Sequence, residues 1–433
     1  MINSIEEAID FIHGLHATGT KSGLTNMRAL MARLSNPQEN LRMLHIAGTN
    51  GKGSTCAMLE AILRAAGYRT GLYTSPYLEV YNERIRLSGA PLSDATLTAL
   101  VRETVPAVEA LSKEGVFVTE FEYGTALAFL AFARAEVEVA VIEVGLGGRL
   151  DPTNVIVPML CAVTAIGMDH MQYLGDTLEA IAREKAGIVK PGVPVVVSHM
   201  EASAQHEIER IAAIAGAPAT LLDGSEAVCL DERRADQTVS FSLNGWMLER
   251  AVLGLTGAHQ LDNAACALAC IAQLRAMGYA LSDEAVREGL ARVAWPGRLE
   301  WIGRALLDGA HNPQGVQVLA AYLQKHVDPA RAVLLSGMLA DKDVDGMCRR
   351  LASCARMVVT APPPVPRAMH QAELAKRFIN AGARDTRACE DALQALRTAQ
   401  SLMGEGDVLI CAGSLYLIGA LRTLLREGEE HGL

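Results

Sequence analysis

Gly48-Thr49-Asn50-Gly51-Lys52-Gly53-Ser54 is the stretch that decides the fold of the first half of the chain. It lies between an apolar run that predicts a strand, 42–47, and a helical pattern over 54–66. Backbone N–H groups at the start of a helix attract anions, and glycines let the backbone approach an anion closely. The stretch therefore predicts a phosphate-binding loop between a strand and a helix.

Within this loop, Lys52 is placed to reach the β- and γ-phosphates of a nucleotide, and Ser54 or Thr55 to offer a hydroxyl to phosphate or Mg²⁺. The sequence of the loop departs from the usual Gly-x4-Gly-Lys-Ser/Thr pattern, because Ile46 stands at the first glycine position and Gly53 separates Lys52 from Ser54. The alternative is a glycine-rich turn with an incidental lysine. The order of strand, loop and helix favours the phosphate loop.

Strand-like and helical patterns alternate along the N-terminal part of the chain. The expected strands are 42–47, 69–73, 137–144, 160–166 and 193–198. Thr119 and Glu122 have the spacing of a capping box, which predicts the start of a helix. Strands that alternate with crossover helices predict βαβ units and a mostly parallel sheet. The segment 221–255 lacks a helical period and predicts a small β insertion.

The alternation starts again after Trp295-Pro296-Gly297, with strands expected at 305–307, 332–337, 357–360 and 408–411. We therefore predict an α/β protein of two domains. Residues 1–295 would form a P-loop-type domain with a mostly parallel sheet and the β insertion. Residues 296–433 would form a smaller, Rossmann-like α/β domain.

Composition argues against several classes of protein. Half of the 433 residues are hydrophobic, which allows a sizeable core, and the nine cysteines include no Cys-x-x-Cys pair. A net charge of -10 without a strongly basic stretch argues against nucleic-acid binding. The longest apolar run, 155–166, is shorter than the ~20 residues that span a bilayer, and the first ten residues do not resemble a signal peptide. We expect a cytoplasmic monomer with no nucleic-acid or membrane partner.

Two stretches resemble the signatures of folylpolyglutamate synthases, a family that is similar to the Mur peptidoglycan ligases. Residues 44–54 resemble the nucleotide loop of the family, and residues 141–154, Val-Ile-Glu-Val-Gly-Leu-Gly-Gly-Arg-Leu-Asp-Pro-Thr-Asn, resemble its second signature. The resemblance runs from about residue 20 to Gly413-Ser414. Weaker blocks follow in the family's order at 74–76, 169–170, 183–188, 257–264, 296–300 and 308–313.

The resemblance implies an ATP- and Mg²⁺-dependent ligase whose substrates are a folate or dihydropteroate and L-glutamate. A folate carboxylate would attack the γ-phosphate of ATP to give an acyl-phosphate, and the amine of glutamate would then displace phosphate. An enzyme of this kind mainly positions reactants and neutralises charge. Two alternatives are a Mur-type ligase of a UDP-sugar peptide and a nucleotide-dependent switch without chemistry. The sequences Lys52-Gly53-Ser54 and Arg149-Leu150-Asp151 favour the folate ligase.

Glu143 is the expected Mg²⁺ carboxylate, because it ends a predicted strand just before a glycine-rich turn, where parallel sheets bind their ligands. Further roles are implied by the resemblance. It implies that the loop Thr49–Ser54 binds ATP, with Lys52 catalytic. It further implies metal contacts for Ser75 and His170, ATP contacts for Asn263 (adenine), Arg298 (phosphates) and Asp308 (ribose), glutamate contacts for His311 and Ser414, catalysis by His311, and a carbamylated, catalytic Lys185.

Ordinary structural roles are the alternatives at these positions. Ser75 could be a turn residue before Pro76, and His170 could be a structural hydrogen-bonding histidine. By its spacing on a helix beside Glu184, Lys185 is expected to be a solvated charge.

The chain departs from the family pattern on what the resemblance implies is the folate side. Tyr77 stands where the family often has His after Ser-Pro, and Met171-Gln172 stand where an acidic residue or Thr often follows Asp-His. The segment Thr20–Arg28 lies where bifunctional bacterial members contact dihydropteroate.

Overall fold

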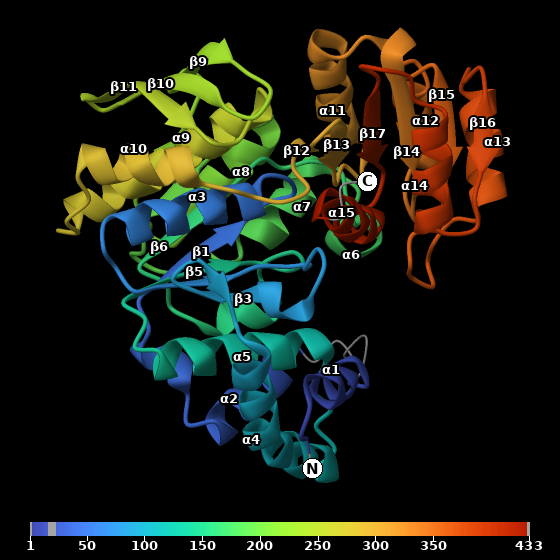
Figure 1. The fold of residues 1–433 in the computed structure, drawn as a ribbon. Coiled ribbons are helices and arrows are strands. Elements are labelled where there is room, and N and C mark those ends of the chain that lie inside the picture. Colours follow the sequence, from blue (N-terminus) through green and yellow to red (C-terminus); the bar gives the residue numbers. More distant parts are fainter. Residues whose placement is uncertain (1, 16–22, 431–433) are drawn as a thin grey trace. The chain divides into compact units, whose positions relative to one another are not determined.

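A computed structural model describes residues 2–15 and 23–430, and the chain forms two compact units (Figure 1). The first unit contains most of the N-terminal two thirds of the chain. The second contains the C-terminal part together with two short segments from around the β insertion. The first unit comprises Met1–Leu230, Val239–Leu253 and Gln260–Val293, and the second comprises Asp231–Thr238, Gly254–His259 and Ala294–Leu433.

The first unit is built on an eight-stranded sheet with the order β4-β3-β2-β5-β1-β6-β7-β8. All neighbours from β2 to β8 pair in parallel, and β3 and β4 add antiparallel pairs at one edge. The predicted mostly parallel sheet is confirmed. The strands are β1 (Met43–Ala47), β2 (Thr70–Tyr73), β3 (Ile85–Leu87), β4 (Ala90–Pro91), β5 (Val139–Glu143), β6 (Leu160–Val163), β7 (Val195–Val197) and β8 (Ala219–Leu221).

Helices pack against this sheet around two buried apolar clusters. One cluster joins the sheet to α1, α2, α4 and α5, and the other joins it to α7 and α8. α5 begins as its sequence predicts, with Thr119 and Glu122 bonded to each other's backbone N–H groups. The helices of this part are α1 (Ile5–His13), α2 (Thr25–Arg33), α3 (Lys52–Ala65), α4 (Asp94–Lys113), α5 (Glu120–Arg134), α6 (Met171–Leu174), α7 (Leu178–Ala186), α8 (Ala202–Ile214), α9 (His259–Ala276) and α10 (Asp283–Arg292).

The β insertion is present as a three-stranded sheet with the order β11-β10-β9. Its strands are β9 (Ala227–Glu232), β10 (Gln237–Leu243) and β11 (Trp246–Leu253). The absence of a helical period in this part of the sequence predicted this outcome.

The second unit has a six-stranded sheet with the order β12-β13-β17-β14-β15-β16, parallel except for the β12–β13 pair. Parallel strands with intervening helices agree with the predicted C-terminal α/β fold. The elements are β12 (Glu300–Ile302), β13 (Ala305–Asp308), α11 (Pro313–His326), β14 (Ala332–Ser336), α12 (Val344–Leu351), β15 (Met357–Thr360), α13 (Gln371–Asn380), β16 (Thr386–Ala388), α14 (Ala392–Ser401), β17 (Val408–Ala412) and α15 (Leu415–Glu430). No helix in the described parts of the chain is long and apolar enough to cross a bilayer.

Two element boundaries differ from the sequence prediction at the phosphate loop. β6 ends at Val163 instead of residue 166, and α3 begins at Lys52 instead of residue 54. The carbonyl of Ala165 accepts hydrogen bonds from the N–H groups of Thr49 and Asn50, so it is used by the loop and not by a strand. Apolar periodicity cannot reveal such a boundary, because the partner lies more than a hundred residues away.

Candidate active site

The predicted phosphate loop connects β1 to α3 and depends on two glycines. Gly51, at the N-terminal end of α3, has a φ of 88°, in the left-handed region that favours glycine. A Cβ at Gly48 would lie 1.8 Å from Oγ1 of Thr164. A side chain at either position would therefore distort the loop.

The end of β6 holds this loop in place. The hydroxyl of Thr164 donates to the carbonyl of Asn50 at 2.8 Å. The Oγ1 of Thr49 donates to the carbonyl of Gly167 and accepts from its N–H, both at 3.1 Å. Hydrogen bonds to the residues that follow β6 thus fix the first half of the loop, and α3 fixes its second half. Such rigidity is what a preorganised anion site requires.

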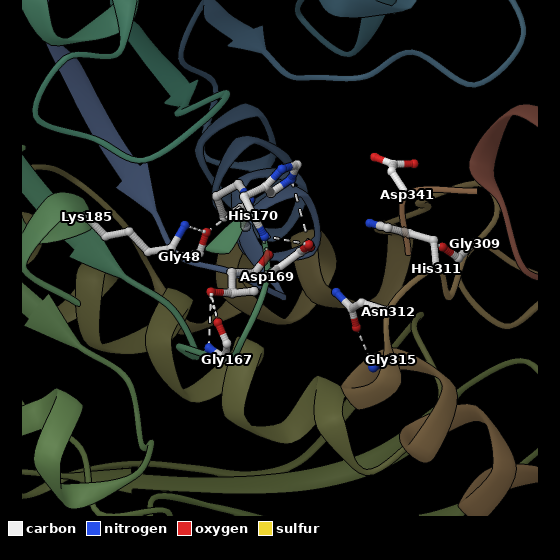
Figure 2. Close-up of polar contacts among 12 residues, drawn as sticks. Gly48, Gly167, Asp169, His170, Lys185, Gly309, His311, Asn312, Gly315 and Asp341 are labelled. Carbon is white, nitrogen blue, oxygen red and sulfur yellow. Dashed lines mark hydrogen bonds and ion pairs between the residues drawn. The ribbon is translucent and has the colours of Figure 1, made fainter. Parts of the chain in front are cut away.

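Two lysines meet at one carbonyl of the loop. Lys185 Nζ donates to the carbonyl of Gly48 at 2.8 Å (Figure 2). Lys52 Nζ donates to the same oxygen at 3.1 Å and to that of Thr49 at 3.3 Å. Lys185 is only 5% exposed. Burial, and secondarily the charge of Lys52, lowers the pKa of Lys185 to about 7. The expectation of a solvated Lys185 is therefore wrong.

The second signature stretch explains how α7 brings Lys185 to the loop. A Cβ at Gly148 would lie 2.6 Å from the carbonyl oxygen of Lys185, and one at Gly187 would lie 2.5 Å from Cα of Arg149. The N–H of Arg149 donates to the carbonyl of Glu184, and its guanidinium pairs with the Glu184 carboxylate at 2.9 Å. The glycines allow this close contact, so the end of α7 lies against the turn that follows β5.

Glu143 and Ser75 lie together at the carboxyl ends of neighbouring strands. Glu143 is the last residue of β5, directly beside β1, and it is 4% exposed. Its Oε2 accepts from the backbone N–H of Ser75 at 3.1 Å. An anionic oxygen donor next to a phosphate loop fits a hard divalent cation. No cluster of three or more His, Cys, Asp or Glu side chains suited to a metal occurs in residues 2–15 and 23–430, so nucleotide oxygens and water would have to complete such a site.

His170 lies at the N-terminal end of the short helix α6, with a left-handed φ of 50°. Its backbone N–H donates to Oδ1 of Asp169, and its Nε2 lies 3.9 Å from Oδ2 of the same carboxylate (Figure 2). The imidazole is 42% exposed. His170 is thus accessible, and one carboxylate beside it belongs to its own neighbour in the chain.

Asn263 and Gln260, one turn apart on α9, contact the phosphate loop. Asn263 Nδ2 donates to Oε1 of Gln260 at 2.9 Å, and Gln260 Nε2 donates to Oγ of Ser54 at 3.4 Å. Asn263 Oδ1 occupies space that a Cβ at Gly51 would need, at 2.0 Å. Gln260 is a site residue that sequence reasoning missed. Its spacing of three from Asn263, on one face of a helix, was the available signal.

Asp151 is a second missed residue. Its buried carboxylate accepts from the N–H groups of Leu146 and Thr153 and from the Thr153 hydroxyl, so it closes the glycine-rich turn after Glu143. His45 on β1 bonds to that hydroxyl at 2.8 Å. Burial lowers the pKa of His45 to about 3, so this imidazole stays neutral at physiological pH.

In the second unit, Arg298 and Asp308 come together at the end of β13. The Asp308 carboxylate accepts from the N–H groups of Leu299 and Ala310, both at 2.9 Å. Burial raises the pKa of Asp308, and the nearby Arg298 charge opposes that effect. A Cβ at Gly309 would lie 2.3 Å from the guanidinium of Arg298, so the glycine makes room for this side chain.

His311 and Asn312 follow on the same loop. His311 Nδ1 donates to the carbonyl of Gly309 at 2.8 Å, which makes Nε2 the acceptor in the neutral ring (Figure 2). Asn312 caps α11 through the N–H of Gly315. Ser414 follows β17 and is 1% exposed, and its hydroxyl has no hydrogen-bond partner within residues 2–15 and 23–430.

The structure also shows where residues that depart from the family pattern lie. The ring of Tyr77 lies under the guanidinium of Arg84, whose Cζ is 5.3 Å from the ring centroid. Met171 is half exposed at the start of α6. Of the segment Thr20–Arg28, residues 20–22 lie outside the described residues, and α2 begins at Thr25.

The first unit has a glycine-rich phosphate loop in a parallel sheet, and a second α/β unit follows it along the chain. This combination indicates the class to which the protein belongs. Residues 46–271 match the Mur ligase middle domain, and residues 297–415 match the Mur ligase glutamate ligase domain. The architecture and both matches are those of Mur-type ligases.

Individual relatives narrow this class. The chain is 40% identical to the dihydrofolate synthase/folylpolyglutamate synthase of Bacillus subtilis over 98% of this chain and 100% of that protein. It resembles the structure of Mycobacterium tuberculosis folylpolyglutamate synthase complexed with ADP, with a TM-score of 0.90, 35% identity, and coverage of 97% and 98% of the two chains. It also resembles E. coli FolC in complex with DHPP and ADP, with a TM-score of 0.87, 32% identity, and 99% coverage of both. The chain belongs to the folylpolyglutamate synthase/dihydrofolate synthase family of ligases.

Proposed function

We propose that this enzyme uses ATP to join L-glutamate to the carboxylate of a folate through an acyl-phosphate, releasing ADP and phosphate. The observation that carries the proposal is the arrangement around Gly48. Two lysines share its carbonyl, and a buried carboxylate, Glu143, ends the adjacent strand. This combination suits a polyphosphate together with a cation. Two relatives of known structure are described as complexes with ADP, which agrees with this reading.

The phosphate loop would bind ATP through its backbone N–H groups and Lys52. Lys52 Nζ donates to two carbonyls of its own loop. A phosphate would attract this ammonium more strongly than a neutral carbonyl does, because hydrogen bonds between charged groups are about twice as strong. Nucleotide binding is therefore expected to turn Lys52 away from Gly48 and leave that carbonyl to Lys185.

Glu143 fits the role of Mg²⁺ ligand, with Ser75 beside it and His170 as a candidate at a second metal position. A bound Mg²⁺ would neutralise charge on the transferring phosphoryl group. The contribution of the chain is to hold Glu143 in one orientation through the N–H of Ser75.

Lys185 is proposed to be carbamylated. Near neutral pH a substantial share of this amine is uncharged, because its pKa is about 7. An uncharged amine can attack CO2, form an N–C bond and release a proton, which leaves an anionic carbamate. The carbamate could orient a metal or phosphate, a role that the family resemblance also implies.

The remaining roles are proposed for the second unit and for α9. Arg298 would contact phosphates, Asp308 the ribose, and His311 and Ser414 the incoming glutamate, while Asn263 would contact adenine. With Nδ1 tied to Gly309, neutral His311 could accept a proton from the glutamate amine through Nε2. We further propose that residues 1–295 bind ATP and folate and that residues 296–433 form the glutamate-ligating domain.

The substrate is tested by ADP release in three parallel assays, each with ATP and Mg²⁺. The first contains tetrahydrofolate and glutamate, the second dihydropteroate and glutamate, and the third a UDP-sugar peptide with its amino acid. We expect turnover in the first. Turnover in the second as well would add dihydrofolate synthase activity, which the names of the relatives from Bacillus subtilis and E. coli include. Turnover in the third alone would overturn the folate assignment.

A further inference from the structure

Gln260 is a fully buried amide that joins α9 to the phosphate loop. It is 0% exposed and lies 206 positions from Ser54, its hydrogen-bond partner. Burial of an amide costs free energy unless its hydrogen bonds are made. We propose that Gln260 is a positioning residue that sets the hydroxyl of Ser54 as a donor towards a nucleotide phosphate. This inference rests on the proposed nucleotide site.

The direction of the hydrogen bonds supports this role. Asn263 Nδ2 donates to Oε1 of Gln260 at 2.9 Å, so the amino group of Gln260 is the end that faces Ser54. Reversing the Gln260 amide would bring two NH2 groups together. Gln260 Nε2 therefore donates to Oγ of Ser54, at a long distance of 3.4 Å.

A serine hydroxyl has one hydrogen to donate. Because its oxygen accepts from Gln260, that hydrogen remains available for another acceptor. Phosphate oxygens only accept hydrogen bonds at neutral pH. Ser54 lies in the first turn of α3, where the backbone N–H groups also favour an anion. The amide pair on α9 thus prepares Ser54 for a ligand made of acceptors.

The loop is shaped to receive this pair. Asn263 Oδ1 lies where a side chain at Gly51 would have to be, and Gly51 has a left-handed φ. α9 therefore meets the phosphate loop at two points, Gly51 before the helix and Ser54 within it. A residue that served packing alone would not need this order of donors and acceptors.

Gln260→Met tests the proposal, because it keeps the length of the side chain and removes the donor. The dissociation constant of ADP is measured by calorimetry for the wild type, Gln260→Met, Ser54→Ala and the double variant. We expect Gln260→Met to weaken ADP binding about three- to tenfold, as the loss of one hydrogen bond would. In the Ser54→Ala background, the same substitution should have no further effect.

Gln273→Met is the matched control. Gln273 is also on α9 and donates to a threonine hydroxyl, Oγ1 of Thr220, at 3.0 Å, far along the helix from the phosphate loop. It should leave ADP binding unchanged. If the effects of Gln260→Met and Ser54→Ala add, Gln260 serves packing alone and the proposal is wrong.

Two further outcomes are distinguishable. If the wild type neither binds ADP nor turns over ATP, the proposed nucleotide site fails, and the role of Gln260 fails with it. If Gln260→Met does not fold, Gln260→Asn replaces it, since the shorter amide remains polar but cannot reach Ser54. The dissociation constant of ADP is then compared among the wild type, Gln260→Asn, Ser54→Ala and their double variant, and it tests the proposal in the same way.

Discussion

Replacing Lys185 with Met should stabilise the protein while abolishing its activity. The gap between the ordinary lysine pKa of 10.5 and the folded value of about 7 corresponds to about 5 kcal/mol. Lys185 is 5% exposed, so little of this cost is relieved by solvent. The hydrogen bond to Gly48 offsets part of it, by about 1.5–3 kcal/mol for a charged donor. Methionine has a similar length and carries neither the charge nor the bond.

The pH dependence of the free energy of unfolding gives a more precise expected value than the total effect does. Because the folded pKa lies below the unfolded one, the unfolded chain holds more protons between about pH 7 and pH 10.5. The stability of the wild type therefore rises with pH through this window, and the penalty is fully present only below it. The advantage of Lys185→Met should shrink by about 2.5 kcal/mol between pH 6.5 and pH 9.

Urea unfolding at pH 6.5, 7.5 and 9, in buffers freed of CO2, measures this difference. The exposed Lys113, at the end of α4, gives the matched control Lys113→Met. It should show no change with pH relative to the wild type. A constant difference between Lys185→Met and the wild type over this range would refute the argument that Lys185 is buried with a lowered pKa.

Four further results are expected. Lys185→Ala should lose turnover, and short carboxylates or bicarbonate should restore part of it; electron density that ends at an ordinary Nζ, with nucleotide and Mg²⁺ bound, would contradict the carbamate. Lys52→Ala should lower kcat by about two orders of magnitude or more without loss of fold, because a charged contact to phosphate is removed; near-normal kcat would remove Lys52 from the phosphate site. Glu143→Gln should raise the Mg²⁺ concentration needed for half-maximal activity, since it removes charge and keeps shape; an unchanged Mg²⁺ titration would exclude Glu143 as a ligand. His311→Ala should raise the KM of glutamate more than that of ATP, and the opposite pattern would show that its role is misassigned.

The amino-acid sequence by itself indicated the central strands of both large sheets and their order along the chain, but not the edge strands β3, β4, β8, β12 and β16. Apolar periodicity predicted the strands, and the pair Thr119 and Glu122 predicted the start of α5, because these signals depend on residues a few positions apart. The same reasoning placed the phosphate loop between β1 and α3 and Glu143 at a strand end.

Only the tertiary structure decided how those residues meet. Lys185 is 137 positions from Gly48, and Gln260 is 206 positions from Ser54, so no local pattern links them. By spacing alone Lys185 is a surface charge, yet contact through Gly148 and Gly187 holds the end of α7 against the turn that follows β5, and Lys185 is buried. Burial and the field of Lys52 then set its pKa. Desolvation and charge–charge interactions depend on distances in space, which the folded chain creates and the order of its residues does not display.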